Sequence, residues 1–273
     1  MRIAIAGAGG LAKYISHEFP KHGHSVVILT RSEKEYFRDR PHIAQVITDY
    51  SVASIVAAFG DCEILISVIL SYATEFLDIH LNLIKTCQLS PKCKRFILSE
   101  FFGDIENYPD LPPLYSEVRE PTRKTLVCYG WLVDYIVPKG NLYLMNIGEG
   151  FPIDAIRNRI VIPGTGKDAV DVTATRDLAT PYVYVSGTKT CWNDLAQLVQ
   201  KRYPAIREVK RNSTDQEELL LAHYQTFVPL GAVSFDPGKV EAHRRKFFAG
   251  LQFRSPGQLI DEVEEDPDKV VRD

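Results

Sequence analysis

The first hundred residues alternate short runs of β-branched and aliphatic residues with longer amphipathic segments. Parallel strands cannot be joined by a tight turn, so each strand needs a crossover long enough to hold a helix. Five runs bounded by polar residues or glycine are expected to be strands: Ile3–Ala6, Ser25–Thr30, Ala44–Thr48, Glu63–Val68 and Arg95–Leu98. The alternation predicts an α/β fold built on a doubly wound parallel sheet.

Three of the intervening segments carry apolar residues at helical spacing, and they cover residues 11–22, 51–59 and 76–87. In the first segment, Leu11, Ile15 and Phe19 fall on one helical face. Gly23 then supplies a stop, because glycine readily adopts the left-handed conformation that ends many helices. We expect these apolar faces to cover the sheet.

The alternation becomes irregular after Ser99, beginning with a loop rich in proline and aspartate at Asn107–Pro113. Further along, Ile160–Ile162 and Val170–Val172 flank a Pro-Gly-Thr-Gly sequence, which predicts a hairpin. Helices are expected from Thr190 through Val199, at 213–224, where Ser213 and Gln216 have capping-box spacing, at 237–249, and from Ser255-Pro256 onward. We predict a nucleotide-binding domain over residues 1–140 and a smaller α/β substrate-binding part over 141–273, with an approximate boundary.

Composition excludes several functional classes for this chain of 273 residues. The formal net charge of −3 gives no electrostatic reason to expect a nucleic-acid partner. Five cysteines without a Cys-x-x-Cys pair suggest reduced thiols, and seven scattered histidines lack the spacing of a metal site. The N-terminus does not resemble a secretory signal, and no apolar run reaches the ~20 residues needed to span a membrane. We therefore expect a cytoplasmic protein without a metal centre.

A glycine-rich turn follows the first predicted strand and opens the first predicted helix. Read as G-x-G-x-x-A, its third small residue is Ala12; read as G-x-x-G-x-x-G, its last glycine is replaced by Lys13. The first reading is favoured, because a lysine side chain would have to leave the contact between strand and helix. Such a turn brings unpaired helix N–H groups to a dinucleotide diphosphate, as in Rossmann folds. The residues expected to hold it are Gly7, Gly9, Gly10, Leu11 and Ala12.

The end of the second predicted strand indicates which dinucleotide is bound. NAD-selective sites place a carboxylate there for the ribose hydroxyls, whereas this chain has Thr30, Arg31 and Ser32, with Lys34 just beyond. A guanidinium beside a hydroxyl suits a 2′-phosphate, so we predict NADP as the cofactor. The alternative is that Arg31 is only a solvated surface arginine.

Other strand ends supply further candidates by position alone. Asp49 and Tyr50 follow the third strand and could border the adenine, although Asp49 could equally cap the next helix. Ser67 and Val68 end the fourth strand near the expected phosphate and ribose crevice. Ser99 ends the fifth strand and is a candidate for both cofactor binding and catalysis.

Five segments occur in an order typical of one family. They are GAGGLAKYI, LTRS, RFILSEFFGDIE, GWLVDYIVPK and VIPGTGKDAVDVTATRDLA. Over roughly residues 1–180 the chain resembles the NmrA-like and isoflavone-reductase-like branch of atypical short-chain dehydrogenases, and fungal members in particular. The resemblance implies an NADP-binding Rossmann domain, a smaller substrate-binding part, and aromatic or polyketide-like substrates of secondary metabolism.

The same resemblance implies a lysine on the helix after the fifth strand, which reductases of the family use in catalysis. The corresponding stretch, Leu114–Arg119, contains none, and Tyr115 or Arg119 stands in its place. Tyr115 and Arg119 are four residues apart, the spacing at which a cation lowers the pKa of a tyrosine that protonates a substrate carbonyl. Ser99 would orient that carbonyl. Arginine supplies charge but cannot relay a proton. Tyr135 and Lys139 share the spacing, but Pro138 separates them in an apolar run that resembles a strand.

Three functions are compatible with these residues. The first is an NADPH-dependent reductase acting on a small-molecule substrate, with Ser99, Tyr115 and Arg119 as catalytic residues. The second is a non-catalytic sensor that binds NADP(H) and a protein partner, which the missing lysine favours. The third is a cyclase or isomerase that keeps the dinucleotide for positioning. The oligomeric state stays open, with a homodimer among the options.

Overall fold

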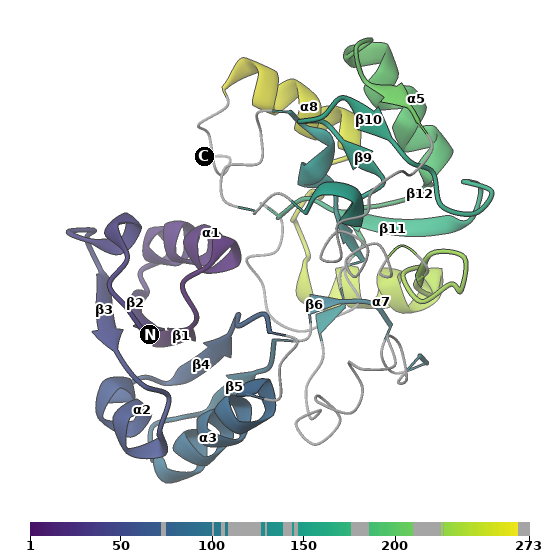
Figure 1. Ribbon diagram of the computed structural model, residues 1–273. Coiled ribbons are helices and arrows are strands. Elements are labelled where there is room, and N and C mark those ends of the chain that lie inside the picture. The colour runs from purple at the N-terminus through teal and green to yellow at the C-terminus, as the bar shows by residue number, and fades with distance from the viewer. Residues whose placement is uncertain are drawn as a thin grey trace. The chain divides into compact units, whose positions relative to one another are not determined.

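A computed structural model describes residues 1–71, 75–99, 101–104, 107–108, 127–128, 130–138, 144, 147–175, 186–209, 225 and 227–266. These residues form two compact units (Figure 1). The first unit holds the described residues up to Ser99, and the second holds those from Phe101 onward. The division predicted at residue 140 stays a prediction.

The first unit is a parallel sheet with the strand order β3-β2-β1-β4-β5. Its strands are β1 Arg2–Ala6, β2 Ser25–Thr30, β3 Ile43–Ile47, β4 Ile64–Ser67 and β5 Arg95–Ile97. In the register of the sheet Ala6 pairs with both Leu29 and Ser67, so β1, β2 and β4 end at one edge. The predicted strands and the doubly wound, Rossmann-type topology are confirmed.

Three helices cover the two faces of this sheet: α1 Gly10–Glu18, α2 Val52–Phe59 and α3 Glu75–Leu89. Side chains of β1 alternate between the faces, since Ile5 packs with Ile15 of α1 whereas Ala4 packs with Ile55 of α2. The predicted first helix changes at Phe19 into a 3-10 turn, because Pro20 cannot donate a helical hydrogen bond. Gly23 closes the turn with a φ of +73°.

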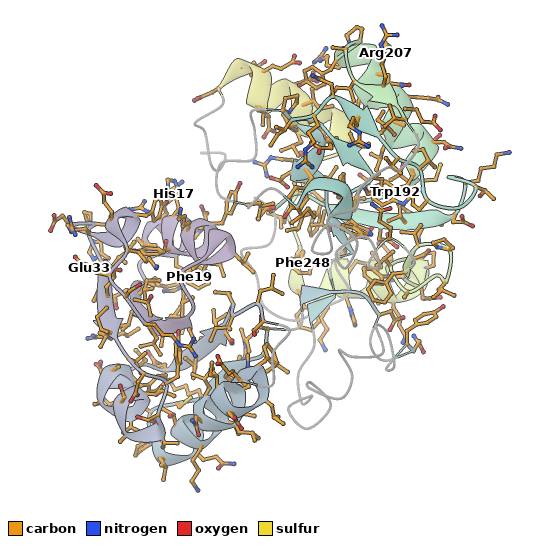
Figure 2. All side chains as sticks on the ribbon, viewed as in Figure 1. His17, Phe19, Glu33, Trp192, Arg207 and Phe248 are labelled. Atoms are coloured by element: carbon orange, nitrogen blue, oxygen red, sulfur yellow. The ribbon has the colours of Figure 1, made fainter. Side chains whose placement is uncertain are left out.

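The described residues of the second unit include three small sheets and three α-helices. The sheets are β12-β11-β8, β13-β10-β9 and β6-β7. Their strands are β6 Phe101–Phe102, β7 Val127–Cys128, β8 Trp131–Leu132, β9 Ile153–Asp154, β10 Arg159–Ile160, β11 Ala169–Thr173, β12 Thr188–Cys191 and β13 Arg207–Glu208. The helices are α5 Trp192–Arg202, α7 Pro237–Phe247 and α8 Pro256–Glu265. Trp192 lies in the core of this unit (Figure 2). Its ring is edge-on to those of Trp131 and Phe151.

The predicted hairpin between residues 160 and 172 is wrong. Ile160 pairs with Ile153, whereas Val172 pairs with Thr188, so the two segments belong to different sheets. The Pro-Gly-Thr-Gly turn instead docks on the start of α5, where the Asn193 N–H donates to the carbonyl of Gly166 at 3.0 Å. A turn sequence therefore identified a reversal but not the pairing partner of each strand.

Other local predictions for this unit concern Thr190, Tyr135 and two helices. Thr190 does not cap α5, because it belongs to β12 and pairs with Val170, and the N-cap is Cys191. Tyr135 lies in a 3-10 turn, Val133–Ile136, rather than in a strand, and packs against Phe151. The helix predicted from Ser255-Pro256 is confirmed. The helix predicted at 213–224 lies outside the described residues.

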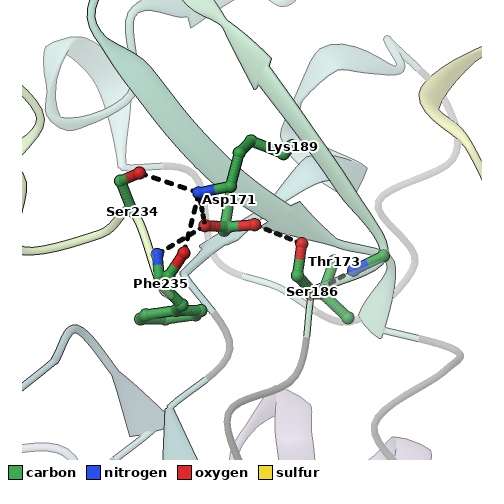
Figure 3. Close-up of polar contacts among 7 residues, drawn as sticks. Asp171, Thr173, Ser186, Lys189, Ser234 and Phe235 are labelled. Carbon is green, nitrogen blue, oxygen red and sulfur yellow. Dashed lines mark hydrogen bonds and ion pairs between the residues drawn. The ribbon is translucent and has the colours of Figure 1, made fainter. Parts of the chain in front are cut away.

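The buried carboxylate of Asp171 links separate segments of the second unit by hydrogen bonds (Figure 3). Asp171 on β11 is fully buried, and its Oδ2 accepts from Lys189 Nζ at 2.8 Å and from the Phe235 N–H at 2.6 Å. Its Oδ1 accepts from the hydroxyl of Ser186. Lys189 also donates to the Ser234 hydroxyl at 2.8 Å. The charge is thus paired and hydrogen-bonded inside the protein, as a buried charge requires.

Across the part of the chain that the structure describes, no helix combines the length and apolarity needed to cross a membrane. Nor do the described residues bring three or more His, Cys, Asp or Glu side chains together in an arrangement suited to a metal ion.

Candidate functional site

Gly7, directly after β1, is required by the protein's own backbone and packing. Its φ is +107°, a conformation that side-chain-bearing residues rarely adopt. A Cβ at this position would also lie 3.2 Å from Val68 Cγ2 and 3.3 Å from Ile69 Cγ1. The turn after β1 is therefore packed closely against the segment that follows β4.

Gly9 differs from Gly7, because nothing in the described part of the chain requires a glycine there. It is the N-cap of α1, its φ of −80° suits any residue, and an added Cβ would meet no atom of the described residues within 4 Å. The first turn of α1 contains no acidic residue, and no side chain caps it. The open space thus lies over a helix N-terminus whose N–H groups and dipole favour an anion.

Ala12, the last residue of the motif, is buried, whereas the following residue, Lys13, is only half-buried. Ala12 is fully buried and packs with Ile5 and Ile28 of the sheet, where only a small side chain fits between helix and strand. Lys13 leaves that contact, and its Nζ lies 5.0 Å from the centre of the Tyr36 ring. The turn therefore has the geometry of G-x-G-x-x-A.

Arg31 follows β2 at the same edge of the sheet. Its side chain is 58% exposed, and its Nη2 lies 3.4 Å from Oε2 of Glu75, the first residue of α3. The guanidinium carbon is 5.8 Å from the ring centre of Tyr50. An exposed pair of this kind contributes roughly 0–1 kcal/mol to stability, so it gives little structural reason for an arginine at this position.

Hydrogen bonds hold the loop that carries Arg31. The Thr30 hydroxyl donates to the carbonyl of Ser32 at 2.9 Å. Gln45 of β3 binds the main chain of Lys34 twice, accepting from its N–H at 2.8 Å and donating to its carbonyl at 2.9 Å. The loop is therefore shaped by neighbouring strands, while Ser32 and Lys34 are themselves exposed.

The ring of Tyr50 lies beside the guanidinium of Arg31. Tyr50 is buried, its φ is +63°, and its hydroxyl donates to the Leu29 carbonyl at 2.7 Å. Burial raises the pKa of Tyr50 to about 12, so the phenol is neutral over the physiological range.

Asp49 is engaged in the turn before α2. Its Oδ1 accepts from the Ser51 N–H at 2.8 Å, and this hydrogen bond lowers the pKa of the Asp49 carboxyl. The N-cap of α2 is Ser51, whose hydroxyl oxygen accepts from the Ser54 N–H at 3.3 Å. A contact between Asp49 and an adenine stays a prediction.

Ser67, at the end of β4, is bonded to a histidine that the sequence did not single out. Its hydroxyl lies 2.8 Å from Nε2 of His80, and His80 Nδ1 lies 2.7 Å from the Phe76 carbonyl. Because a carbonyl only accepts, Nδ1 carries a proton, and in the neutral ring the Ser67 hydroxyl donates to Nε2. The sequence pattern did not identify His80 as a site residue, because His80 lies beside the apolar face of α3, one helical turn from Phe76.

Of the three catalytic candidates, the structure describes Ser99. Ile97 of β5 pairs with Ile66 of β4, so Ser99, two residues after Ile97, is level with Val68, two residues after Ile66. The register places Ser99 at the same sheet edge as Gly7 and Val68, and Ser99 is buried there. Tyr115 and Arg119 lie outside the described residues, and the predicted constellation of the three stays a prediction.

No family model matches the sequence. A full-length curated relative is the oxidoreductase swnR of Metarhizium robertsii, 42% identical over 306 residues that cover 99% of this chain and 100% of the relative. Because 306 exceeds the 273 residues of this chain, the relative carries residues without a counterpart here. An isoflavone reductase homolog A622-like protein of Nicotiana tabacum is 23% identical over 192 residues, which cover 65% of this chain and 61% of that protein.

Solved structures with similar folds cover nearly the whole chain. Leucoanthocyanidin reductase from Vitis vinifera, in a ternary complex, has a TM-score of 0.69 at 16% identity and covers 96% of this chain and 99% of its own. The NADPH-dependent quinone oxidoreductase of Escherichia coli, complexed with NADPH, matches equally well at 15% identity, with the same coverage. NmrA, a negative transcriptional regulator, has a TM-score of 0.68 at 14% identity, covering 96% and 95%. At such identities the likeness shows the fold.

Proposed function

The chain belongs to the NmrA-like and isoflavone-reductase-like oxidoreductases, and we propose that it is an NADPH-dependent reductase of a small aromatic or polyketide-type metabolite. One observation carries the proposal. The open space at Gly9 and the exposed guanidinium of Arg31 lie at the same edge of the Rossmann sheet. Substrate binding is assigned to the part of the chain from residue 141 to 273.

Features of the described turn after β1 support dinucleotide binding. The N–H groups of Gly9, Gly10 and Leu11 would hold the diphosphate, since a helix N-terminus lacking acidic residues attracts negative charge. Ala12 keeps α1 close to the sheet, and Gly7 lets the turn pack against β4. When bound, the nicotinamide supplies a hydride.

Selection of NADP over NAD is assigned to Arg31. A 2′-phosphate accepts charge-assisted hydrogen bonds from a guanidinium, which are stronger than neutral ones. Ser32 and Lys34 follow on the same loop, exposed and held by the bonds from Thr30 and Gln45. The ring of Tyr50 lies beside the Arg31 guanidinium, whose carbon is 5.8 Å from the ring centre.

The reaction requires the substrate oxygen to gain a proton while its carbon gains hydride. We assign the proton to the phenol of Tyr115 and the orientation of the carbonyl to the hydroxyl of Ser99. Arg119 would lower the pKa of Tyr115 by its positive charge. Because arginine does not release its proton, Tyr115 is reprotonated by solvent rather than through Arg119.

Turnover by the purified full chain tests this proposal. NADPH consumption, followed by its near-ultraviolet absorbance, is expected with at least one member of a panel of aromatic ketones and enones. Tyr115→Phe should abolish turnover and leave NADPH affinity unchanged, because it removes only the phenolic hydroxyl that donates the proton. Saturable NADPH binding without turnover of any panel member would count against a reductase.

The second candidate is a sensor that binds NADP(H) and a protein partner without turnover. The observation favouring it is the absence of lysine from the stretch Leu114–Arg119. A sensor should capture a stoichiometric partner whose affinity changes between NADP and NADPH. A cyclase or isomerase would instead convert a substrate at constant NADPH concentration, which product analysis detects.

A further inference from the structure

Three of the chain's five cysteines lie in the first unit, where β4 and β5 begin. Cys62 comes two residues before β4, and Cys93 comes two residues before β5. The two strands start level, because the Lys94 N–H donates to the Glu63 carbonyl at 2.7 Å. Cys87 lies in the last turn of α3, the helix that precedes β5 and packs against it (Figure 1). These thiols lie at the opposite end of the strands from the proposed cofactor site and take no part in the proposed reaction.

The turn between α3 and β5 brings Cys87 and Cys93 together. Ser90, the first residue after the helix, donates through its hydroxyl to the Thr86 carbonyl at 2.8 Å, and its own carbonyl accepts from the Cys93 N–H at 3.0 Å. The chain thus folds back on the last turn of the helix. Both cysteines are half-buried and pack against the same apolar cluster of the sheet, and a hydrogen bond joins their side chains.

This hydrogen bond makes the two thiols chemically different. Donation by Cys87 lowers the pKa of the Cys93 thiol, and the same bond raises the pKa of Cys87. In its thiol form Cys93 also donates weakly to the Arg95 carbonyl, at 3.7 Å, a bond that is lost when the thiol ionises. Because the thiolate is the nucleophile in disulfide chemistry, Cys93 is the attacking group of the pair.

Cys62 is near enough to Cys93 for their charges to interact, but its surroundings differ. Its side chain is fully buried, and burial raises the pKa of Cys62 to about 11. Cys62 therefore stays a protonated thiol over the physiological range and is shielded from dissolved reagents. The reactive pair is Cys87 and Cys93.

We propose that Cys87 and Cys93 form a redox modification site, at which a small disulfide such as oxidised glutathione produces an intramolecular disulfide bond. The Cys93 thiolate attacks one sulfur of the small disulfide, forms a mixed disulfide and releases one glutathione thiolate. The Cys87 thiol then loses its proton to solvent, and its sulfur attacks Cys93 Sγ and releases the second glutathione thiolate. Two electrons pass from the protein thiols to glutathione, and the new bond joins the end of α3 to the start of β5.

Peptide mapping of the purified full chain tests the proposal without any substitution. The reduced protein is incubated with oxidised glutathione at neutral pH, the remaining thiols are alkylated, and the chain is digested with trypsin. Cleavage after Lys92 separates Cys87 from Cys93, so the expected bond appears as two joined peptides that dithiothreitol releases. Alkylated Cys93, a mixed disulfide that persists there, or a bond from Cys93 to another cysteine overturns the proposal.

Two substitutions separate the roles of the two thiols. Cys87→Ser blocks the second step and keeps a hydrogen-bond donor beside Cys93, so one glutathione should stay attached to Cys93. Cys93→Ala removes the attacking group, and attachment to Cys87 should be at least about fivefold slower, because little of that thiol is ionised. Cys191→Ser is the matched control, since Cys191 is also half-buried but belongs to the second unit, and the bond should form at the wild-type rate. Equal attachment rates in the first two variants overturn the proposal.

Urea distinguishes a site built by the fold from one that reflects the short spacing of the cysteines. Unfolding removes the turn at Ser90 and the bond between the thiols, so the pKa of Cys93 returns to the ordinary value of about 8.5. In Cys87→Ser at neutral pH, glutathione should therefore attach to Cys93 at least about fivefold faster in the folded chain than in urea. An equal or faster reaction in urea overturns the proposal.

Discussion

The Gly9 turn of the first unit and the Asp171 cluster of the second unit use polar groups in opposite ways. Each oxygen of Asp171 accepts a hydrogen bond from the protein, and the Lys189 ammonium donates to that carboxylate and to the Ser234 hydroxyl. At the Gly9 turn, the helix N-terminus has no acidic or side-chain partner, and Arg31 has only an exposed one. Polar groups satisfied within the protein stabilise the fold, whereas groups left open at a sheet edge are available to a ligand.

Asp171→Ala should have the largest effect on stability. It leaves the Lys189 ammonium without its buried counter-charge, and we expect the free energy of unfolding to fall by about 3–5 kcal/mol. Urea denaturation measures this change. Asp168→Ala is the control, because within the described residues the Asp168 carboxylate accepts only from the exposed hydroxyl of Thr165, at 3.2 Å. A similar loss in both variants would show that Asp171 contributes no more to the free energy of unfolding than Asp168 does.

Arg31→Ala tests the other side of the comparison. We expect NADPH affinity to fall about ten- to hundredfold, the range for loss of a charge-assisted hydrogen bond, with NADH affinity unchanged. The free energy of unfolding should change by less than about 0.5 kcal/mol, since the side chain is exposed. Arg38→Ala, which breaks an exposed pair with Glu33, is the control. An equal loss for both dinucleotides would remove Arg31 from selection.

Two glycines of one motif should separate folding from binding. Gly7→Ala should lower the free energy of unfolding by about 1–3 kcal/mol, because its backbone is left-handed and Val68 blocks a Cβ. Gly9→Ala should leave that free energy within about 0.5 kcal/mol and weaken dinucleotide binding about tenfold, since its Cβ occupies the ligand's space. Thermal unfolding and calorimetry measure the two effects. Unchanged binding in Gly9→Ala would mean that the space at Gly9 is not used.

The buried Tyr50 predicts a pH dependence of stability. Its folded pKa, about 12, is raised above the ordinary value near 10, so the fold favours the neutral phenol. The resulting stabilisation is complete below pH ~10 and is lost as the pH rises toward ~12. Tyr50→Phe should lose less stability over that interval than the wild type in urea titrations at each pH. Identical slopes would contradict the role of burial at Tyr50.

Glu75→Gln should have the smallest effect. Glu75 competes with a 2′-phosphate for Arg31, and an exposed pair contributes about 0.2–1 kcal/mol. Removing its charge should therefore raise NADPH affinity by up to about fivefold and leave NADH affinity unchanged. Weaker NADPH binding would indicate that Glu75 supports Arg31 rather than competes with it.

Sequence alone predicted the first unit well, because each strand is a β-branched run and each helix carries a regular apolar face. The glycine turn, Arg31 and the edge position of Ser99 followed from the same topology. The second unit was predicted less well, since its strands are two to five residues long and most of them pair with a strand at least 14 residues away in sequence. The Ser67–His80 bond and the Cys87–Cys93 contact could not be foreseen, because they depend on side chains brought together by tertiary packing.

Binding of NADP(H) by the Gly9 turn and Arg31 can be measured by calorimetric titration of the wild-type chain with NADPH and with NADH at one fixed salt concentration. We expect saturable binding of one dinucleotide per chain, with NADPH the tighter ligand. If neither dinucleotide binds saturably, or if the two bind with equal affinity, the Gly9 turn and Arg31 do not form an NADP(H) site.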